Sequence, residues 1–183
     1  RQPQRERQAV YNLVVDASTT DLEGLEWFTN LQDLTVSGAQ LGSIEAGMLP
    51  SSLTSLRASG CALESIDLSS TGRLMTLDLS NNPLGTLDAS SLARLTNANF
   101  ANCNLAGEFN VTANTRLEHI DVSGNPALVT LNALGVPGLA IEGAVTADST
   151  CTVVSNAAPA ADEGDEGADE GQNAPEDGEE PQA

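Results

Sequence analysis

The sequence predicts a solenoid of stacked coils, in which each coil adds one short strand to a parallel sheet. Three observations lead to this fold class. The stretch Leu74–Leu84 reads LMTLDLSNNPL, with leucine at its first, fourth, sixth and eleventh positions and asparagine at its ninth. The same pattern returns along the chain with a period of about 21 residues. Between the repeats, Gly, Ser, Pro and Asn stand where a long helix would need good helix formers.

This spacing is the signature of a leucine-rich repeat, and seven copies follow one another. They begin at Val10, Leu31, Leu53, Leu74, Leu95, Leu117 and Val136. Their fourth positions are Leu13, Leu34, Leu56, Leu77, Ala98, Ile120 and Leu139, and their sixth positions are Val15, Val36, Ala58, Leu79, Phe100, Val122 and Ile141. All fourteen are apolar, so alternate side chains of every strand point into one core. We therefore expect a leucine-rich-repeat solenoid with a curved parallel β-sheet on its concave side.

The convex half of each coil has a second set of apolar positions. These are Leu41 and Ile44, Leu63 and Ile66, Leu84 and Leu87, Leu105 and Phe109, and Leu128 and Leu131. Because turn-forming residues surround them, we expect short strands, turns and 3₁₀ pieces on this side instead of full helices.

The ninth positions decide how two of the three cysteines are interpreted. They are Ser18, Ala39, Cys61, Asn82, Cys103, Asn125 and Ala144. Asparagine here turns inward and pairs with backbone groups that burial would otherwise leave unsatisfied. Cys61 and Cys103 lie two coils apart, roughly 10 Å by strand spacing and beyond the roughly 7 Å that a disulfide spans. We expect two buried, inert thiols, while Cys151 in the last turn is free or pairs with a segment outside this sequence.

Charge and composition divide the 183 residues into three parts. Residues 1–9 form an N-terminal cap remnant and residues 10–156 the solenoid. Residues 157–183 hold ten acidic side chains and no basic one, so this tail or linker is expected to be disordered. The net charge of −19 and the absence of a basic stripe argue against nucleic-acid binding. No apolar run reaches 18 residues, which argues against membrane insertion.

The third, fifth and seventh positions of each repeat point outward from the predicted sheet. They are mostly small, polar and mildly acidic side chains, which suits a weak contact or a basic protein partner drawn in by charge. The bland alternative is a solvated face without a partner. The candidate partner-binding residues are Tyr11, Asp33, Arg57, Asp78, Asn99, His119 and Asp121. We expect a monomer.

One group on this face has the residue types of a hydrolase triad. His119, Asp121 and Ser123 alternate along one strand, but alternate residues lie nearly 7 Å apart and project in parallel. A triad needs successive hydrogen bonds and an oxyanion hole, and the chain has no G-x-S-x-G elbow. Asp78, Asn99 and Asp121 form a row of oxygens, yet no backbone carbonyls converge on it as a calcium site requires. We predict no enzymatic activity, no cofactor and no metal.

Three stretches also carry a family resemblance. GLEWFTNLQDLTVSGAQLGSI (24–44), LTSLRASGCALESIDLSS (53–70) and LMTLDLSNNPLGTLDASS (74–91) resemble bacterial secreted or surface leucine-rich-repeat proteins of the internalin-like type. The resemblance covers about residues 10–150 and implies a curved solenoid, extracytoplasmic placement and protein binding through the concave face. It favours a non-enzymatic protein–protein interaction module of an exported or cell-surface bacterial protein. The alternative is a structural or spacer domain of a larger envelope protein, with the acidic tail as its linker.

Overall fold

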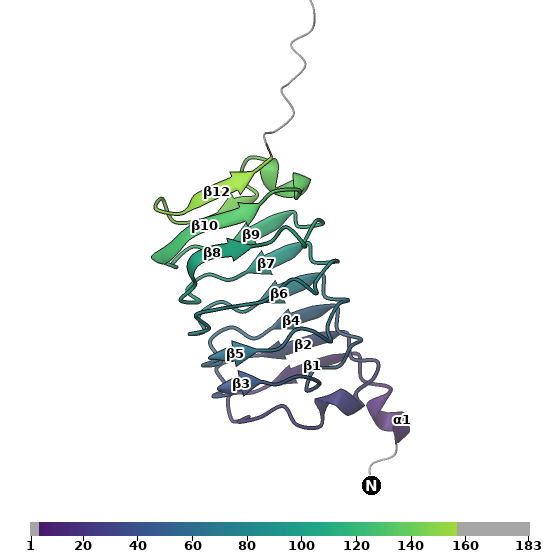
Figure 1. The fold of residues 1–183 in the computed structure, drawn as a ribbon. Coiled ribbons are helices and arrows are strands. Elements are labelled where there is room, and N and C mark those ends of the chain that lie inside the picture. Colours follow the sequence, from purple (N-terminus) through teal and green to yellow (C-terminus); the bar gives the residue numbers. More distant parts are fainter. Residues whose placement is uncertain (1–3, 157–183) are drawn as a thin grey trace, which may run out of the picture.

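Seven short strands lie side by side in one parallel sheet that runs the length of the molecule (Figure 1). The computed structural model describes residues 4–156. In spatial order the strands are β1 (Asn12–Val15), β2 (Asp33–Val36), β4 (Ser55–Arg57), β6 (Thr76–Asp78), β7 (Asn97–Asn99), β9 (His119–Asp121) and β11 (Val145–Thr146). Fourth positions pair with fourth positions from Leu13 with Leu34 through to Ala98 with Ile120. The predicted register is confirmed for six of the seven strands.

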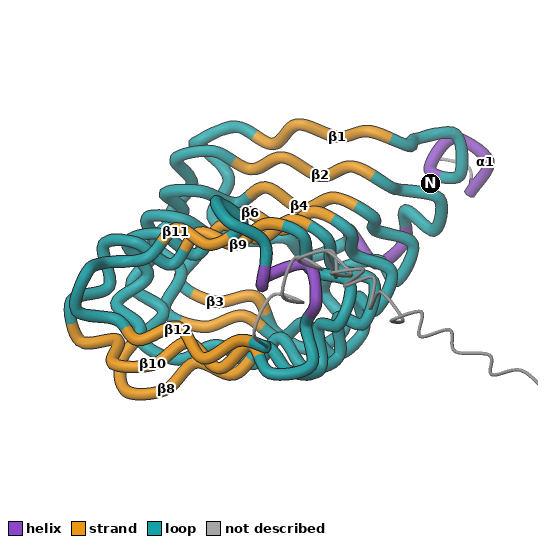
Figure 2. The backbone as a smooth tube through the Cα atoms, turned by 90° about the horizontal axis from the view of Figure 1, so that it is seen from above, coloured by secondary structure: helices purple, strands orange, loops and turns teal. Residues whose placement is uncertain are grey.

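A second layer of strands faces this sheet across the core (Figure 2). It contains the pair β3 (Ser43–Ile44) and β5 (Ser65–Ile66), and a three-stranded sheet of β8 (Ala106–Asn110), β10 (Ala127–Ala133) and β12 (Thr152–Ser155). The helical pieces within residues 4–156 are α1 (Gln4–Arg7) and the 3₁₀ turns η1 (Leu25–Trp27) and η2 (Pro137–Ala140). The prediction of short strands and 3₁₀ pieces opposite the long sheet is confirmed.

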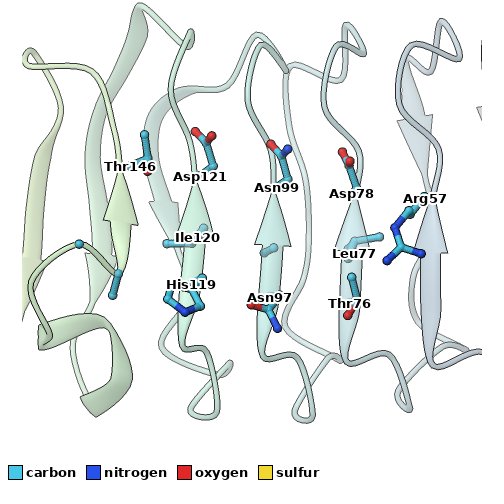
Figure 3. Close-up of a pocket in the computed structure, with 13 residues that line it drawn as sticks. Arg57, Thr76, Leu77, Asp78, Asn97, Asn99, His119, Ile120, Asp121 and Thr146 are labelled. Carbon is cyan, nitrogen blue, oxygen red and sulfur yellow. The ribbon is translucent and has the colours of Figure 1, made fainter.

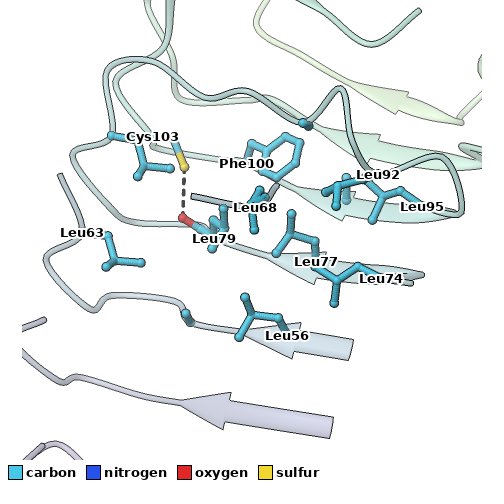
Figure 4. Packing of buried hydrophobic residues seen from close by; sticks show 14 of the residues in the cluster. Leu56, Leu63, Leu68, Leu74, Leu77, Leu79, Leu92, Leu95, Phe100 and Cys103 are labelled. Atoms are coloured by element: carbon cyan, nitrogen blue, oxygen red, sulfur yellow. Dashed lines mark hydrogen bonds between the residues drawn. The ribbon is translucent and has the colours of Figure 1, made fainter. Parts of the chain in front are cut away.

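Leucine side chains from both layers fill the space between the sheets (Figure 4). Leu34, Leu56 and Leu77 are each at most 1% exposed, as the repeat pattern predicts. At β7 the small Ala98 accompanies the large Phe100, whose ring meets Phe109 edge to face at 5.6 Å between centroids. The wide side chain at the sixth position therefore occupies volume that the small one at the fourth leaves open.

The two asparagines at ninth positions are buried and bind neighbouring coils together. Asn125 Oδ1 accepts hydrogen bonds from the backbone N–H groups of Cys103 and Leu105, both at 3.0 Å. Its Nδ2 donates to three carbonyls, those of Phe100, Val122 and Ser123. Asn82 repeats the arrangement one pair of coils earlier, with Cys61 and Leu63 as its donors. These amides pair with backbone N–H and C=O groups of the turns, which the hydrogen bonds between strands do not satisfy, as expected for the ninth position.

The two ninth-position cysteines are free and fully buried, as predicted. Each thiol donates to a strand carbonyl of the preceding coil: Cys61 to Val36 O at 3.4 Å, and Cys103 to Leu79 O at 3.1 Å (Figure 4). Desolvation raises the pKa of Cys103 from 9.0 to about 11, and it raises the pKa of Cys61 as well. Because nucleophilic attack needs the thiolate, both groups are inert near neutral pH.

The last coil departs from the predicted register. Leu139 lies in η2 and not on a strand, and Ile141, predicted to be in the core, is 67% exposed. The strand that pairs with β9 on its outer side is β11, with Val145 opposite Ile120. The last two strands of the long sheet are therefore 25 residues apart in sequence, instead of the 19 that the repeat pattern predicted. Pro137 explains the difference, since proline has no N–H for a sheet ladder but fits the first position of a helical turn. Gly138, Ala140 and Glu142 are the third, fifth and seventh positions of the predicted last repeat, and contrary to the prediction they do not lie on a strand of the long sheet.

Replacing Asn125 by Ala removes a buried amide that makes five hydrogen bonds to backbone groups. We expect Asn125→Ala to lower the free energy of unfolding by about 3 kcal/mol, because several buried groups lose their partner at once. Chemical denaturation measures the loss. Thr86→Ala, an exposed polar truncation, is the control and should change stability by less than about 0.5 kcal/mol. Equal losses for the two variants would contradict this role.

Gly138 packs directly on the preceding coil. A Cβ atom placed there would lie 2.2 Å from the carbonyl oxygen of Leu117, which is backbone and cannot rotate away. We expect Gly138→Ala to destabilise the chain by about 2 kcal/mol through this overlap. The matched control is Gly72→Ala, whose added Cβ would meet Ser91 O at an ordinary 3.5 Å. Thermal unfolding of both variants checks the prediction, and equal melting temperatures would refute it.

The raised pKa of Cys103 makes stability depend on pH in the alkaline range. In the unfolded chain the thiol loses its proton near pH 9, whereas in the folded chain it keeps the proton up to about pH 11. The unfolded state therefore binds fewer protons in this window, and the free energy of unfolding falls as pH rises from 9 to 11. Urea unfolding at several pH values should show a shallower fall for Cys103→Ala than for the wild type. Parallel curves would contradict the assignment.

Candidate functional site

A shallow pocket of about 260 Å³ opens on the outward face of the seven-stranded sheet, between β4 and β11 (Figure 3). We call the outward side chains of this sheet the sheet face. Five of the seven predicted site residues line the pocket: Arg57, Asp78, Asn99, His119 and Asp121. The other two lie outside it, because Asp33 is on β2 and Tyr11 precedes β1.

The polar side chains of the pocket form two rows that run across the strands (Figure 3). Thr76, Asn97 and His119 come from the third positions, and Asp78, Asn99 and Asp121 from the fifth. Neighbours within a row belong to adjacent strands, which lie roughly 4.8 Å apart in a sheet. The pocket floor is therefore a regular grid of hydrogen-bonding groups.

Prediction from sequence left several pocket residues out of the candidate set. Thr76 and Asn97 occupy outward-pointing third positions of their repeats, so the repeat pattern could have predicted that they line the pocket. Thr146, Gly143 and Ala144 also line the pocket. These three could not be found, because the predicted register placed the seventh strand ahead of its observed position at β11.

Hydrogen bonds to neighbouring residues hold the fifth-position side chains. Asp78 Oδ1 accepts from Ser80 N at 2.9 Å and from Ser80 Oγ at 2.7 Å. Asp121 Oδ1 accepts in the same way from Ser123, at 2.9 and 2.6 Å. Asn99 Oδ1 accepts from Ala101 N at 3.1 Å. Within residues 4–156 the second carboxylate oxygens and the Asn99 amide nitrogen make no such bond, so fixed groups remain available to a ligand.

The side chain of Arg57 is held along its own strand, β4, by a residue two positions earlier. Its Nη1 donates a hydrogen bond to Ser55 Oγ at 3.3 Å. Within residues 4–156, Arg57 forms no ion pair with Asp78 on the neighbouring strand. The guanidinium is exposed beside the pocket, so the site combines one cation with two carboxylates.

The arrangement does not provide a catalytic triad. Ser123 Oγ donates to Asp121, so the hydroxyl is bonded to the carboxylate and not to His119. Among residues 4–156 no group of three or more His, Cys, Asp and Glu side chains is placed to hold a metal ion. The pocket can supply hydrogen bonds and ion pairs to a ligand.

Within residues 4–156, no helix is long and apolar enough to cross a membrane.

Comparison with known proteins identifies the repeat class. The family described as "Endo-beta-N-acetylglucosaminidase EndoS LRR domain" matches residues 11–103, half of the chain. The chain belongs to this leucine-rich-repeat family. The matched segment contains the first five strands of the long sheet in full, which are β1, β2, β4, β6 and β7. The architecture builds extended binding surfaces from stacked repeats.

Among solved structures, the chain is similar to one titled "Functional domain of InlJ from Listeria monocytogenes includes a cysteine ladder". The sequences are 18% identical and the TM-score is 0.44. The match covers 76% of this chain and 44% of that one, so this chain spans less than half of its length. No curated protein matches the sequence.

Proposed function

We propose that the chain is a non-enzymatic interaction module that binds a protein partner through the sheet face. The observation that carries this proposal is the pocket in which Arg57, Asp78, Asn99, His119 and Asp121 gather on adjacent strands. Asp78 and Asp121 accept lysine or arginine side chains of the partner through their unengaged oxygens. Arg57 binds a carboxylate of the same partner.

The hydrogen bonds that fix the fifth-position side chains favour binding. A side chain that is already fixed loses little rotamer freedom when a partner arrives, so more of the interaction energy remains as affinity. The pocket is shallow, and its lining contains no Trp or Tyr, the residue types that often anchor interfaces. The contact is therefore of modest affinity, and its association rate falls as salt screens the charges.

The parent protein is placed outside the cytoplasm in this proposal, as an exported or cell-surface bacterial protein. The support is the resemblance of residues 10–150 to secreted and surface leucine-rich-repeat proteins. The description of the matching family adds that such a domain occurs in an endo-beta-N-acetylglucosaminidase. This chain contributes binding to its parent protein and not the chemistry of a reaction.

A second candidate function is that of a structural spacer. It is favoured by the composition of residues 157–183, which lie outside the described residues and whose sequence is that of an acidic linker. In this case the sheet face is only a solvated surface, and substitutions on it leave every interaction of the parent protein unchanged.

A peptide library displayed on phage and selected against the full chain tests the proposal. We expect enriched peptides to carry lysine or arginine, and Asp78→Asn/Asp121→Asn to weaken their binding at least about tenfold, because two charge pairs are lost. The double variant keeps an oxygen that can accept from Ser80 and Ser123. Fluorescence anisotropy of a labelled peptide gives the dissociation constants.

The matched control is Asp67→Asn/Asp88→Asn. The Asp67 and Asp88 carboxylates accept hydrogen bonds from Ser69 and Ser90 in the same kind of turn, but they lie off the sheet face. Both double variants remove two negative charges, so they change the net charge equally. The control should bind like the wild type. An equal loss of affinity in both double variants would mean that overall charge, and not the sheet face, determines binding. If no basic peptide is selected, the result would favour the structural spacer.

A further inference from the structure

The two aspartates of the pocket are held in the same way on strands of one sheet. Asp78 and Asp121 occupy fifth positions on β6 and β9, and each carboxylate accepts hydrogen bonds from the serine two residues later. Asn99 of β7 lies between them in the same row (Figure 3). Because the two side chains are two strand spacings apart and similarly oriented, their carboxylates lie about 9.6 Å apart.

This spacing matches one backbone conformation of a bound chain. A polyproline II helix has three residues per turn and rises about 3.1 Å per residue, so side chains three positions apart share a face at about 9.3 Å. An extended strand places successive side chains of one face only about 6.8 Å apart. An α-helix reaches about 10.5 Å with residues seven positions apart, but its backbone groups are already bonded internally.

The amide side chains of the pocket favour a chain whose backbone is free. Asn99 Oδ1 accepts from Ala101 N, and within residues 4–156 Asn99 Nδ2 makes no hydrogen bond. Asn97, in the neighbouring row, is exposed. Side-chain amides donate to and accept from peptide groups, and a polyproline II chain has no internal hydrogen bonds. Its carbonyls are therefore available to these amides.

Given the proposed function, in which the sheet face binds a basic partner, we propose that the bound segment of that partner is a polyproline II stretch with two basic residues three positions apart. The segment lies across the strands of the long sheet. One basic side chain pairs with Asp78 and the other with Asp121. Asn99 donates to a carbonyl of the segment between them.

Arg57 limits the row on one side. It pairs in register with Asp78 from β4, so one strand spacing beyond Asp78 the sheet face is positive. A third basic residue on that side would meet a like charge, whereas an acidic residue would pair with Arg57. The bound segment therefore carries an acidic residue outside the basic residue that contacts Asp78.

Other ionisable groups on or beside the sheet face lie off this row. His119 is a third position, and Glu118 and Glu142 line a separate hollow together with it. Asp33 is also a third position, on β2 and beyond the pocket. The three carboxylates add negative potential around the pocket, which favours a basic segment but does not set the spacing of its charges.

Short fluorescent peptides built on proline test the proposal, because proline holds them in the polyproline II conformation. Three peptides carry two lysines that are two, three or four positions apart, and the full chain is titrated into each at fixed pH and low salt. In this helix a shift by one residue turns the second lysine by about 120°. We expect the peptide with spacing three to bind about fivefold more tightly than the other two.

Variants of the chain locate the effect. Asp78→Asn and Asp121→Asn should each remove the preference for spacing three, because one lysine then lacks a charged partner. Asp88→Asn is the matched control, since Asp88 accepts from Ser90 in the same kind of turn but lies off the sheet face, and it should keep the preference. A glutamate two residues before the first lysine should strengthen binding to the wild type but not to Arg57→Gln. Circular dichroism confirms that each variant is folded.

The possible results distinguish failure of the spacing from failure of the proposed function. If the three peptides bind equally and Asp78→Asn weakens all of them, the basic partner stands and the polyproline II spacing is overturned. A preference for spacing three that persists in both Asp78→Asn and Asp121→Asn would also overturn it. If no lysine peptide binds at any spacing, the proposed function fails together with this inference.

Discussion

The stacking of coil on coil through the leucine columns is the constraint on which the rest of this structure depends. A single coil has one short strand and a few apolar side chains, too little to bury a core of its own. Once coils stack, Leu34, Leu56 and Leu77 reach near-complete burial, and the strands acquire ladder partners on both sides. Every other feature follows from keeping this stack in register.

Register has a polar component that is as specific as the apolar one. Asn82 and Asn125 each bind the turn of their own coil to the turn of the coil before, through both ends of the amide. The intervening cysteines use a single thiol donor toward the preceding strand. Alternation of the two residue types therefore secures turns that the backbone ladders do not reach, while keeping the thiols protonated and inert.

The same periodicity shapes the surface. Because outward positions repeat as faithfully as inward ones, side chains of one column become neighbours on adjacent strands and form the grid of the pocket. Asx-type turns to Ser80 and Ser123 then fix the carboxylates without any partner. Within the described residues, the larger exposed apolar side chains include Trp27 and Ile141, which lie off the polar sheet face.

The sequence by itself determined the fold class, the strand register of six coils, the buried state of Cys61 and Cys103, and the outward alternation of the strand residues in those six coils. It could do so because each of these follows from local spacing, repeated until chance is excluded. Only the tertiary structure decided the course of the last coil, where Pro137 and the close contact of Gly138 with Leu117 O displace the strand to Val145. It also decided that Arg57 bonds to Ser55, and that Trp27 and Ile141 are exposed at opposite ends of the stack. These outcomes depend on contacts between coils, which the spacing within one coil does not contain.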